Sequence, residues 1–418
     1  MAILRLAWQS LLNRKTTALL TLLTVAISAT LLLSVERVRT QTKESFENTI
    51  SGTDLIVGSR SSQLNLLLYS VFRIGNATNN INWQSYQELK ENPAVDWIIP
   101  ISLGDSHRGF RVIGTNDSYF EHYKFGRKQP LTFQAGEPFD QLLETVVGAE
   151  VARQLGYHVG DEVVIAHGLS DTAFSRHDNA PFTIVGILAP TGTPVDRSVH
   201  VSLEAIEAIH VGWESGANMG YSPDAENLVQ RQYQPEQITA AFLGLNDRRQ
   251  TFGLQRKINT YRQEPLSAIF PGFALQELWD MMSVAEKALM VVSGFVVVAG
   301  LLGMLTGLLT SLNERRREMA ILRAMGARPA HIFFLLVSEA TALTFAGIAL
   351  GVGFLYALLA IIQPIVQQQF GIFLSLAPPT AYEWMLLGIV QLSGIIVGLV
   401  PAFRAYRHSL ADGMTIRV

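Results

Sequence analysis

Residues 287–312 read KALMVVSGFVVVAGLLGMLTGLLTSL, and Lys287 is the one charged residue among them. An α-helix needs about 20 apolar residues to cross the roughly 30 Å hydrocarbon core of a membrane. Three other stretches meet this requirement, so the sequence predicts four spans over residues 16–35, 288–312, 332–362 and 384–403. The third is longer than a straight crossing needs, which indicates a tilt or a projection beyond the membrane.

The first predicted span follows Arg14 and Lys15, as the apolar part of a signal peptide would. However, it is longer than the roughly 7–15 residues of a signal peptide, and residues 35–38 (VERV) lack the small residues of a cleavage site. We therefore expect a retained span. Residues 2–13 read AILRLAWQSLLN and predict either a cytoplasmic interfacial helix over 1–15 or an extension of this span.

Basic residues close to the spans predict the orientation of the chain. Segment 313–331 contains five arginines, and basic residues also occur in segments 1–15 and 404–418. The loop over 363–383 has no Lys or Arg. The sequence therefore predicts that both termini and segment 313–331 are cytoplasmic, and that residues 36–287 lie outside.

The predicted external region has an α/β pattern between two helical stalks. The stalks, over 37–50 and 275–286, extend the first and second spans without Gly or Pro. Short apolar runs bounded by Gly and Pro predict strands, with a β-rich insert over about 115–225 between two flanking α/β pieces that we expect to associate. The expected fold class is thus four transmembrane helices with a large extracytoplasmic α/β domain inserted between spans one and two.

Composition excludes several kinds of function. The chain has no cysteine, which rules out disulfides and thiolate metal sites. Its net charge of −3, without a basic stripe, argues against nucleic-acid binding. No GxxxxGK[ST] pattern occurs, so we expect no ATPase or catalytic motif and no bound cofactor in this chain, with ATP held by a partner subunit.

Residues 313–332 read NERRREMAILRAMGARPAHI. A positive-inside loop alone would explain the arginines. It would not explain the apolar residues that follow them in a cytoplasmic segment, which predict a docking surface for a partner. These residues are Met319, Ala320, Ile321, Leu322, Ala324 and Met325.

This segment resembles the cytoplasmic signature of the MacB/FtsX/LolC-LolE superfamily of ABC transporter permeases, which has an Ile-Leu-Arg-Ala-x-Gly-Ala motif. Residues 146–164 (VVGAEVARQLGYHVGDEVV) and 182–201 (FTIVGILAPTGTPVDRSVHV) resemble the MacB-like periplasmic core domain. Residues 401–414 (PAFRAYRHSLADGM) resemble the basic C-terminal segment of the family. The resemblance thus extends over most of the chain.

The resemblance implies a permease of the bacterial inner membrane that is driven by a cytoplasmic ABC ATPase subunit. It further implies a second permease protomer, either identical or a paralogue, and mechanotransmission through the stalks to extract or export a lipoprotein, peptide or other hydrophobic cargo. A periplasmic adaptor or lipoprotein is a further partner that it allows, besides membrane lipid. The residues implied in ATPase coupling are Glu314, Arg315, Arg316, Arg317, Glu318, Ile321, Leu322, Arg323, Met325 and Gly326.

Two other functions stay open. An FtsX-like regulator would transmit ATPase motion to an external cell-wall hydrolase, although the large β-rich insert favours a transporter. A membrane receptor without an ATPase would leave the apolar cytoplasmic segment unexplained.

Three local features have competing interpretations. Glu339, within the third span, is either a functional intramembrane charge or a side chain that snorkels to the interface. His167, Asp171, His177 and Asp178 fit no compact zinc motif, so we expect a solvated loop there and no metal site. The apolar run 64–72 (LNLLLYSVF) is either a buried helix, which we favour, or an external contact surface.

Overall fold

A computed structural model describes residues 15–167, 179–211, 225–314, 319, 321, 324–370 and 376–407. The chain divides into two compact units. The helical unit comprises residues 1–41, 283–365 and 374–418, and the inserted domain comprises residues 42–282 with 366–373. Segments 1–14 and 408–418, which hold most of the predicted interfacial helix and of the tail, lie outside the described residues.

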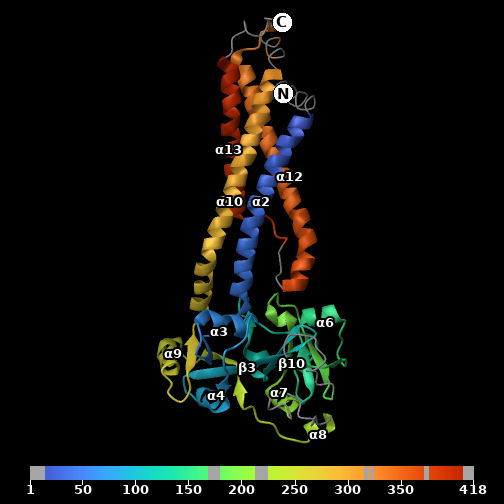
Figure 1. Cartoon of the computed structure of the whole chain (residues 1–418), viewed down its shortest axis with the longest axis vertical. Coiled ribbons are helices and arrows are strands. Elements are labelled where there is room, and N and C mark those ends of the chain that lie inside the picture. Colours follow the sequence, from blue (N-terminus) through green and yellow to red (C-terminus); the bar gives the residue numbers. More distant parts are fainter. Residues whose placement is uncertain are drawn as a thin grey trace. The chain divides into compact units, whose positions relative to one another are not determined.

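The helical unit contains four long apolar helices (Figure 1), each long and apolar enough to cross a membrane. The predicted fold class of four spans with a domain between the first and second is therefore confirmed. The third helix has 42 residues, more than a straight crossing needs, as the sequence indicated, and it contains Pro364 near its end. The helices are α2 (Lys15–Thr49), α10 (Pro271–Glu314), α12 (Pro329–Phe370) and α13 (Ala381–Arg407).

Small residues let α2 pack closely against α12. A Cβ at Gly351 would lie 2.6 Å from the carbonyl oxygen of Ala26, and one at Gly347 would lie 2.7 Å from the Val25 side chain. The Thr30 hydroxyl of α2 donates a 2.9 Å hydrogen bond to the Gly351 carbonyl. The Gly-xxx-Gly spacing at 347 and 351 thus marks a close helix contact.

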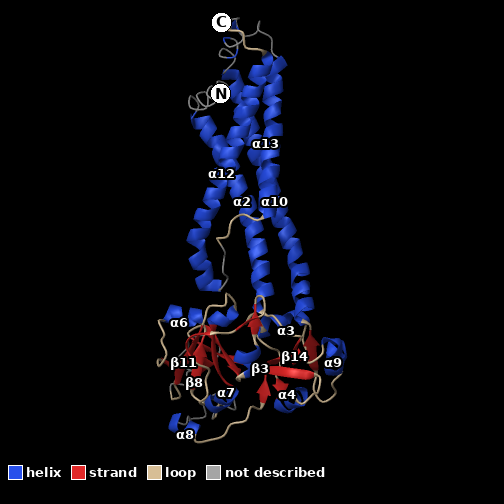
Figure 2. Ribbon diagram, turned by 180° about the vertical axis from the view of Figure 1, so that it is seen from behind, coloured by secondary structure: helices blue, strands red, loops and turns tan. Residues whose placement is uncertain are grey.

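The inserted domain is built on one mixed sheet with helices packed against it (Figure 2). Among the described residues the sheet has 11 strands, in the order β15-β1-β14-β3-β4-β12-β8-β11-β7, with β10 on β3 and β9 on β11. The strands are β1 (Leu55–Ser59), β3 (Val95–His107), β4 (Phe110–Thr115), β7 (Phe133–Gly136), β8 (Glu144–Val147), β9 (Glu162–Val163), β10 (Ala166–His167), β11 (Phe182–Leu188), β12 (Ser198–Ser202), β14 (Ala240–Leu245) and β15 (Leu266–Ile269).

Short elements complete this domain. Two-stranded sheets pair β2 (Ile81–Asn82) with β13 (Gln237–Ile238) and β5 (Lys124–Phe125) with β6 (Gln129–Pro130). The helices are α3 (Gln63–Ser70), α4 (Trp83–Lys90), α5 (Ser118–His122), α6 (Ala149–Leu155), α7 (Leu203–Ile209), α8 (Ala225–Val229) and α9 (Thr251–Asn259), with 3-10 turns η2 (Pro194–Arg197) and η3 (Arg248–Gln250).

The two flanking α/β pieces do associate, because β1, β3, β14 and β15 are neighbours in the sheet. The β-rich middle part, however, does not form a sheet of its own. The 13-residue strand β3 pairs with β14 through Ile101 and with β4 from Ser102 onward. One long strand therefore carries the same sheet into the middle part.

The apolar run at 64–72 forms a buried helix. Ser62 caps α3 by accepting a hydrogen bond from the Asn65 N–H, and Leu66 and Leu67 are fully buried in a core cluster. The alternative of an apolar contact surface in this segment is therefore wrong.

Strand β12 carries a histidine, His200, that is fully buried. Its Nδ1 lies 3.2 Å from the Val146 carbonyl oxygen, and its ring centroid lies 5.0 Å from that of Tyr119. Burial, with the nearby positive charge of Arg73, lowers the pKa of His200 to about 3. The folded domain thus holds this imidazole neutral at any physiological pH.

We predict that His200 makes the inserted domain less stable in acid. Below about pH 6.5 the unfolded imidazole binds a proton that the folded one does not, so stability falls by up to about 1.4 kcal/mol per pH unit. His200→Gln should therefore show a smaller drop in melting temperature between pH 7 and pH 5 than the wild type. His158→Gln, at an exposed position, is the control, and parallel slopes for wild type and His200→Gln would contradict the prediction.

Candidate functional site

The predicted coupling segment links α10 to α12 and is described in part. Helix α10 ends at Glu314, whereas Arg315, Arg316, Arg317, Glu318, Leu322 and Arg323 lie outside the described residues. Met319 packs against a cluster that includes Leu312 of α10 and Ile332 of α12. This contact ties the segment to the ends of both helices.

Two predicted coupling residues are exposed beside that anchor. Ile321 and Met325 have 54% and 72% of their surface accessible, and the Met325 N–H donates to the Ile321 carbonyl. Gly326 then adopts a φ of +95°, a backbone conformation that favours glycine, and α12 starts at Pro329. The turn therefore presents two apolar side chains that the described residues leave exposed.

Glu339 of α12 is 3% exposed, which disagrees with the snorkelling interpretation. It lines a cavity of about 20 Å³ with Thr17, Thr21 and Ser311, which come from α2 and α10. Such a volume holds about one water molecule. A carboxyl group enclosed by three apolar helices is costly, so a functional role stays a prediction. Unchanged ATPase stimulation and transport in Glu339→Gln would remove it.

A buried ion pair joins three helices at the other end of the helical unit. Arg37 of α2 and Glu383 of α13 are 4% and 2% exposed, and Arg37 Nε donates to Glu383 Oε1 at 2.9 Å. Arg37 Nη2 also donates to the Tyr356 hydroxyl of α12 at 2.8 Å and to the Ala377 carbonyl at 2.7 Å. We call Arg37, Tyr356, Ala377 and Glu383 the arginine clasp.

Glu383 is held in place by a capping box at the start of α13. Its Oε2 accepts a 2.7 Å hydrogen bond from the Thr380 N–H, and the Thr380 hydroxyl accepts one from the Glu383 N–H at 3.2 Å. This reciprocal pattern satisfies two backbone donors at the helix start. The same carboxylate thus caps the N-terminus of α13 and forms the ion pair with Arg37.

The sequence carried two signals for the clasp that the site prediction missed. Residues 380–383 read TAYE, which matches the capping-box pattern, and Arg37 lies two residues after the first apolar run ends at Val35. Neither signal says that the two residues meet, since 346 positions separate them. Of the candidate metal residues, Asp171, His177 and Asp178 lie outside the described residues, as does the side chain of His167.

Two models of known protein families match this chain. The family model of the FtsX-like permease C-terminal domain matches residues 290–410. The model of the MacB-like periplasmic core domain matches residues 18–239, more than half of the chain. The chain belongs to the MacB/FtsX family of ABC transporter permeases.

Individual relatives in this family are distant. The macrolide export ATP-binding/permease protein MacB 1 of Yersinia pestis bv. Antiqua is 23% identical over 329 residues, which are 77% of this chain and 46% of that protein. The MacB of Photorhabdus laumondii is 22% identical over 421 residues, 96% of this chain and 59% of that protein. The chain thus spans about half the length of the curated relatives it matches.

Solved structures of two extracytoplasmic domains also align. The periplasmic region of MacB from Actinobacillus actinomycetemcomitans gives 8% identity and a TM-score of 0.33, covering 55% of this chain and 94% of that one. The extracellular domain of the ABC-type transporter YknZ from Gram-positive bacteria gives 12% and 0.30, covering 52% and 99%.

The arginine clasp joins the two segments that the MacB/FtsX family models match. Arg37 lies in the stretch matched by the MacB-like core-domain model, and Tyr356 and Glu383 lie in the stretch matched by the FtsX-like model. In this chain, one guanidinium group therefore connects the two matched segments.

We predict that Arg37 and Glu383 are energetically coupled. Removing one partner of a buried pair leaves an uncompensated charge and costs about 3–5 kcal/mol. Arg37→Met should thus lower the melting temperature of the purified chain strongly, as should Glu383→Gln, which keeps the capping box. The double variant should lose less than the sum of the two.

An exposed pair on the same helix is the control. Lys43 Nζ lies 3.9 Å from Glu47 Oε1, and both side chains are about half exposed. Lys43→Met should therefore change the free energy of unfolding by less than about 1 kcal/mol. Additive losses in the Arg37 and Glu383 variants would show that the pair contributes no coupling.

Proposed function

We propose that this chain is the permease subunit of a MacB/LolE-type ABC transporter and that it relays ATP hydrolysis by a partner to its inserted domain. The observation that carries the proposal is the pair of uninterrupted helices, of 35 residues for α2 and 44 for α10. At 1.5 Å per residue these extend about 52 and 66 Å, well beyond the roughly 30 Å apolar core. Each helix leaves the helical unit and continues into the inserted domain.

The relay needs the helices to move together. The arginine clasp supports this because it holds α2 to α12 and α13 through charge-assisted hydrogen bonds in a site with little solvent. Breaking it would leave both charges buried. A displacement of α12 or α13 would therefore also move α2, and with it the entry to the inserted domain.

The energy would come from a separate cytoplasmic ABC ATPase. The chain contains no Walker A pattern, and the names of its relatives pair ATP-binding with permease functions. Ile321 and Met325 offer an exposed apolar contact, and the neighbouring arginines would add charge contacts. The positive-inside pattern supports cytoplasmic placement of this segment and of both termini.

We further propose that two permease protomers assemble, identical or paralogous, and that the cargo is extracted or exported on the outer side of a bacterial inner membrane. A hydrophobic cargo such as a lipoprotein or peptide fits this scheme. The MacB-like core domain over 18–239 favours a transporter over an FtsX-like regulator of a cell-wall hydrolase.

Affinity purification in mild detergent tests the ATPase partnership. The tagged wild-type chain should recover an ABC ATPase, identified by mass spectrometry and by ATP hydrolysis. Ile321→Asp combined with Met325→Asp should lower its recovery at least tenfold, because carboxylates would replace the apolar contact. Val229→Asp, at a 57% exposed position of the inserted domain, is the control.

The control should recover as much ATPase as the wild type. Failure to recover any ATPase with the wild-type chain would contradict the transporter proposal. Equal recovery by the double variant would contradict the docking site alone.

A further inference from the structure

Helix α9 lies beside the edge strand of the sheet and has exposed apolar groups on one flank. The Gln255 side chain donates to the Ala268 carbonyl of β15, and the Ala268 N–H donates to the Asn259 side chain, which fixes α9 on that strand. Phe252 of α9 is 66% exposed, although its ring centroid lies 4.9 Å from that of Phe270. Phe273, 60% exposed, lies 5.2 Å beyond Phe270.

These three rings form an aromatic row whose middle member is anchored. Phe270 packs against a core cluster, whereas Phe252 and Phe273 have most of their surface in solvent. Single exposed apolar side chains are ordinary, but contacting aromatic rings that a domain leaves uncovered are typical of interaction sites.

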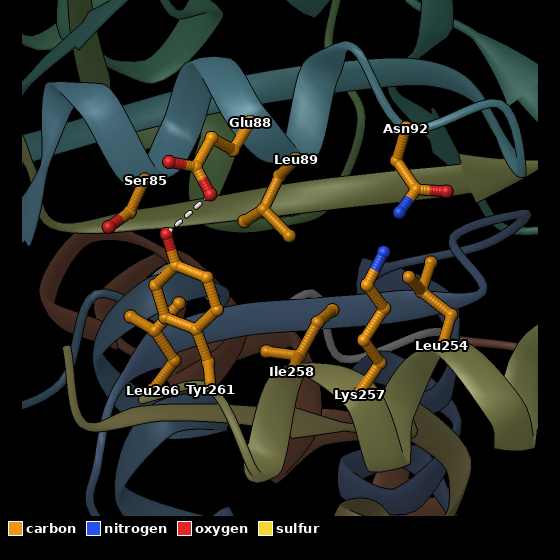
Figure 3. A pocket seen from close by; sticks show the side chains of 9 residues that line it. All are labelled: Ser85, Glu88, Leu89, Asn92, Leu254, Lys257, Ile258, Tyr261 and Leu266. Atoms are coloured by element: carbon orange, nitrogen blue, oxygen red, sulfur yellow. Dashed lines mark hydrogen bonds between the residues drawn. The ribbon is translucent and has the colours of Figure 1, made fainter. Parts of the chain in front are cut away.

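The opposite flank of α9 borders a groove toward α4 (Figure 3). Leu89, Leu254, Ile258 and Leu266 form its apolar floor, and the groove encloses about 60 Å³. In Figure 3 the Lys257 side chain extends across the groove toward Asn92. The hydroxyl of Tyr261 donates to Glu88 Oε2 at 2.6 Å. This volume suits one branched apolar side chain and is too small for the acyl chain of a lipid.

The charges around α9 are unbalanced. Residues 247–264 contain five basic and two acidic residues. Arg248 and Arg249 are paired with Asp54 and Asp247. Within the described part of the chain, no ion pair joins Arg60, Arg256, Lys257 or Arg262 to a carboxylate, and all four are exposed. Arg60 donates to the Asn259 carbonyl, which places it at the end of α9.

We propose that α9 and its two flanks form a docking surface for an acidic segment of another protein. The segment would place one apolar side chain in the α4–α9 groove and set its carboxylates against the unpaired cations. Charge complementarity selects an acidic partner, and the small groove selects a protein segment over a lipid. The aromatic row supplies further contact area at low entropic cost. This inference does not depend on the transport function proposed above.

Photocrosslinking in cells that produce the full chain tests the surface. A photoreactive amino acid replaces Phe252 or Phe273, with Val159, 46% exposed in the same domain, as the control position. We expect adducts at both phenylalanine positions to map by mass spectrometry to a protein segment rich in Asp and Glu with an apolar residue among them. Adducts with lipid, adducts with segments lacking excess acid, or yields no higher than at Val159 would overturn the proposal.

The mapped segment is then made as a fluorescent peptide and titrated with the purified full chain. Arg256→Glu with Lys257→Glu should weaken its binding at least tenfold. Arg127→Glu with Lys128→Glu makes the same charge change at two exposed positions elsewhere in the domain and should leave binding unchanged. Equal affinity of the two double variants would also overturn the proposal.

Discussion

The buried contact between Arg37 and Glu383 is the constraint on which the helical unit depends. A guanidinium group and a carboxylate removed from water are stable only if their hydrogen bonds are satisfied by good geometry. Tyr356 and the Ala377 carbonyl supply acceptors to Arg37 Nη2, and the Thr380 N–H supplies a donor to Glu383. Arg37 Nη1 has no hydrogen-bond partner among the described residues. The pair therefore specifies how three helices meet, which apolar packing alone would leave less well determined.

The same constraint connects packing to function. Helix α2 contacts α12 through small residues over residues 22–30 and through the clasp at Arg37, and it then continues into the inserted domain. There the long strand β3 carries a single sheet from the flanking pieces into the middle part. Under the proposed relay, a displacement of α2 would act on a domain that is built on one continuous sheet.

Much of the fold could be predicted because its signals are local. Apolar run length identified the four spans, and short apolar runs indicated strands such as β11 and β14. The continuation of the sheet through β3 and the meeting of Arg37 with Glu383 are contacts between distant positions, and no local pattern encodes them. For the coupling segment, the sequence shows that Ile321 and Met325 are apolar. It does not show that Met319 packs against the helix ends whereas Ile321 and Met325 stay exposed, because this depends on contacts between α10 and α12.

The most direct test of the account is whether α2 and α13 move as one body during the ATPase cycle. Because the chain has no cysteine, spin labels can be placed at Val38→Cys and Met385→Cys, both at exposed positions. The distance between the labels would be measured by pulsed electron paramagnetic resonance in the purified ATPase complex, without nucleotide and with trapped ATP. The account predicts the same distance distribution in both states; a shift of several ångströms on ATP binding would contradict it.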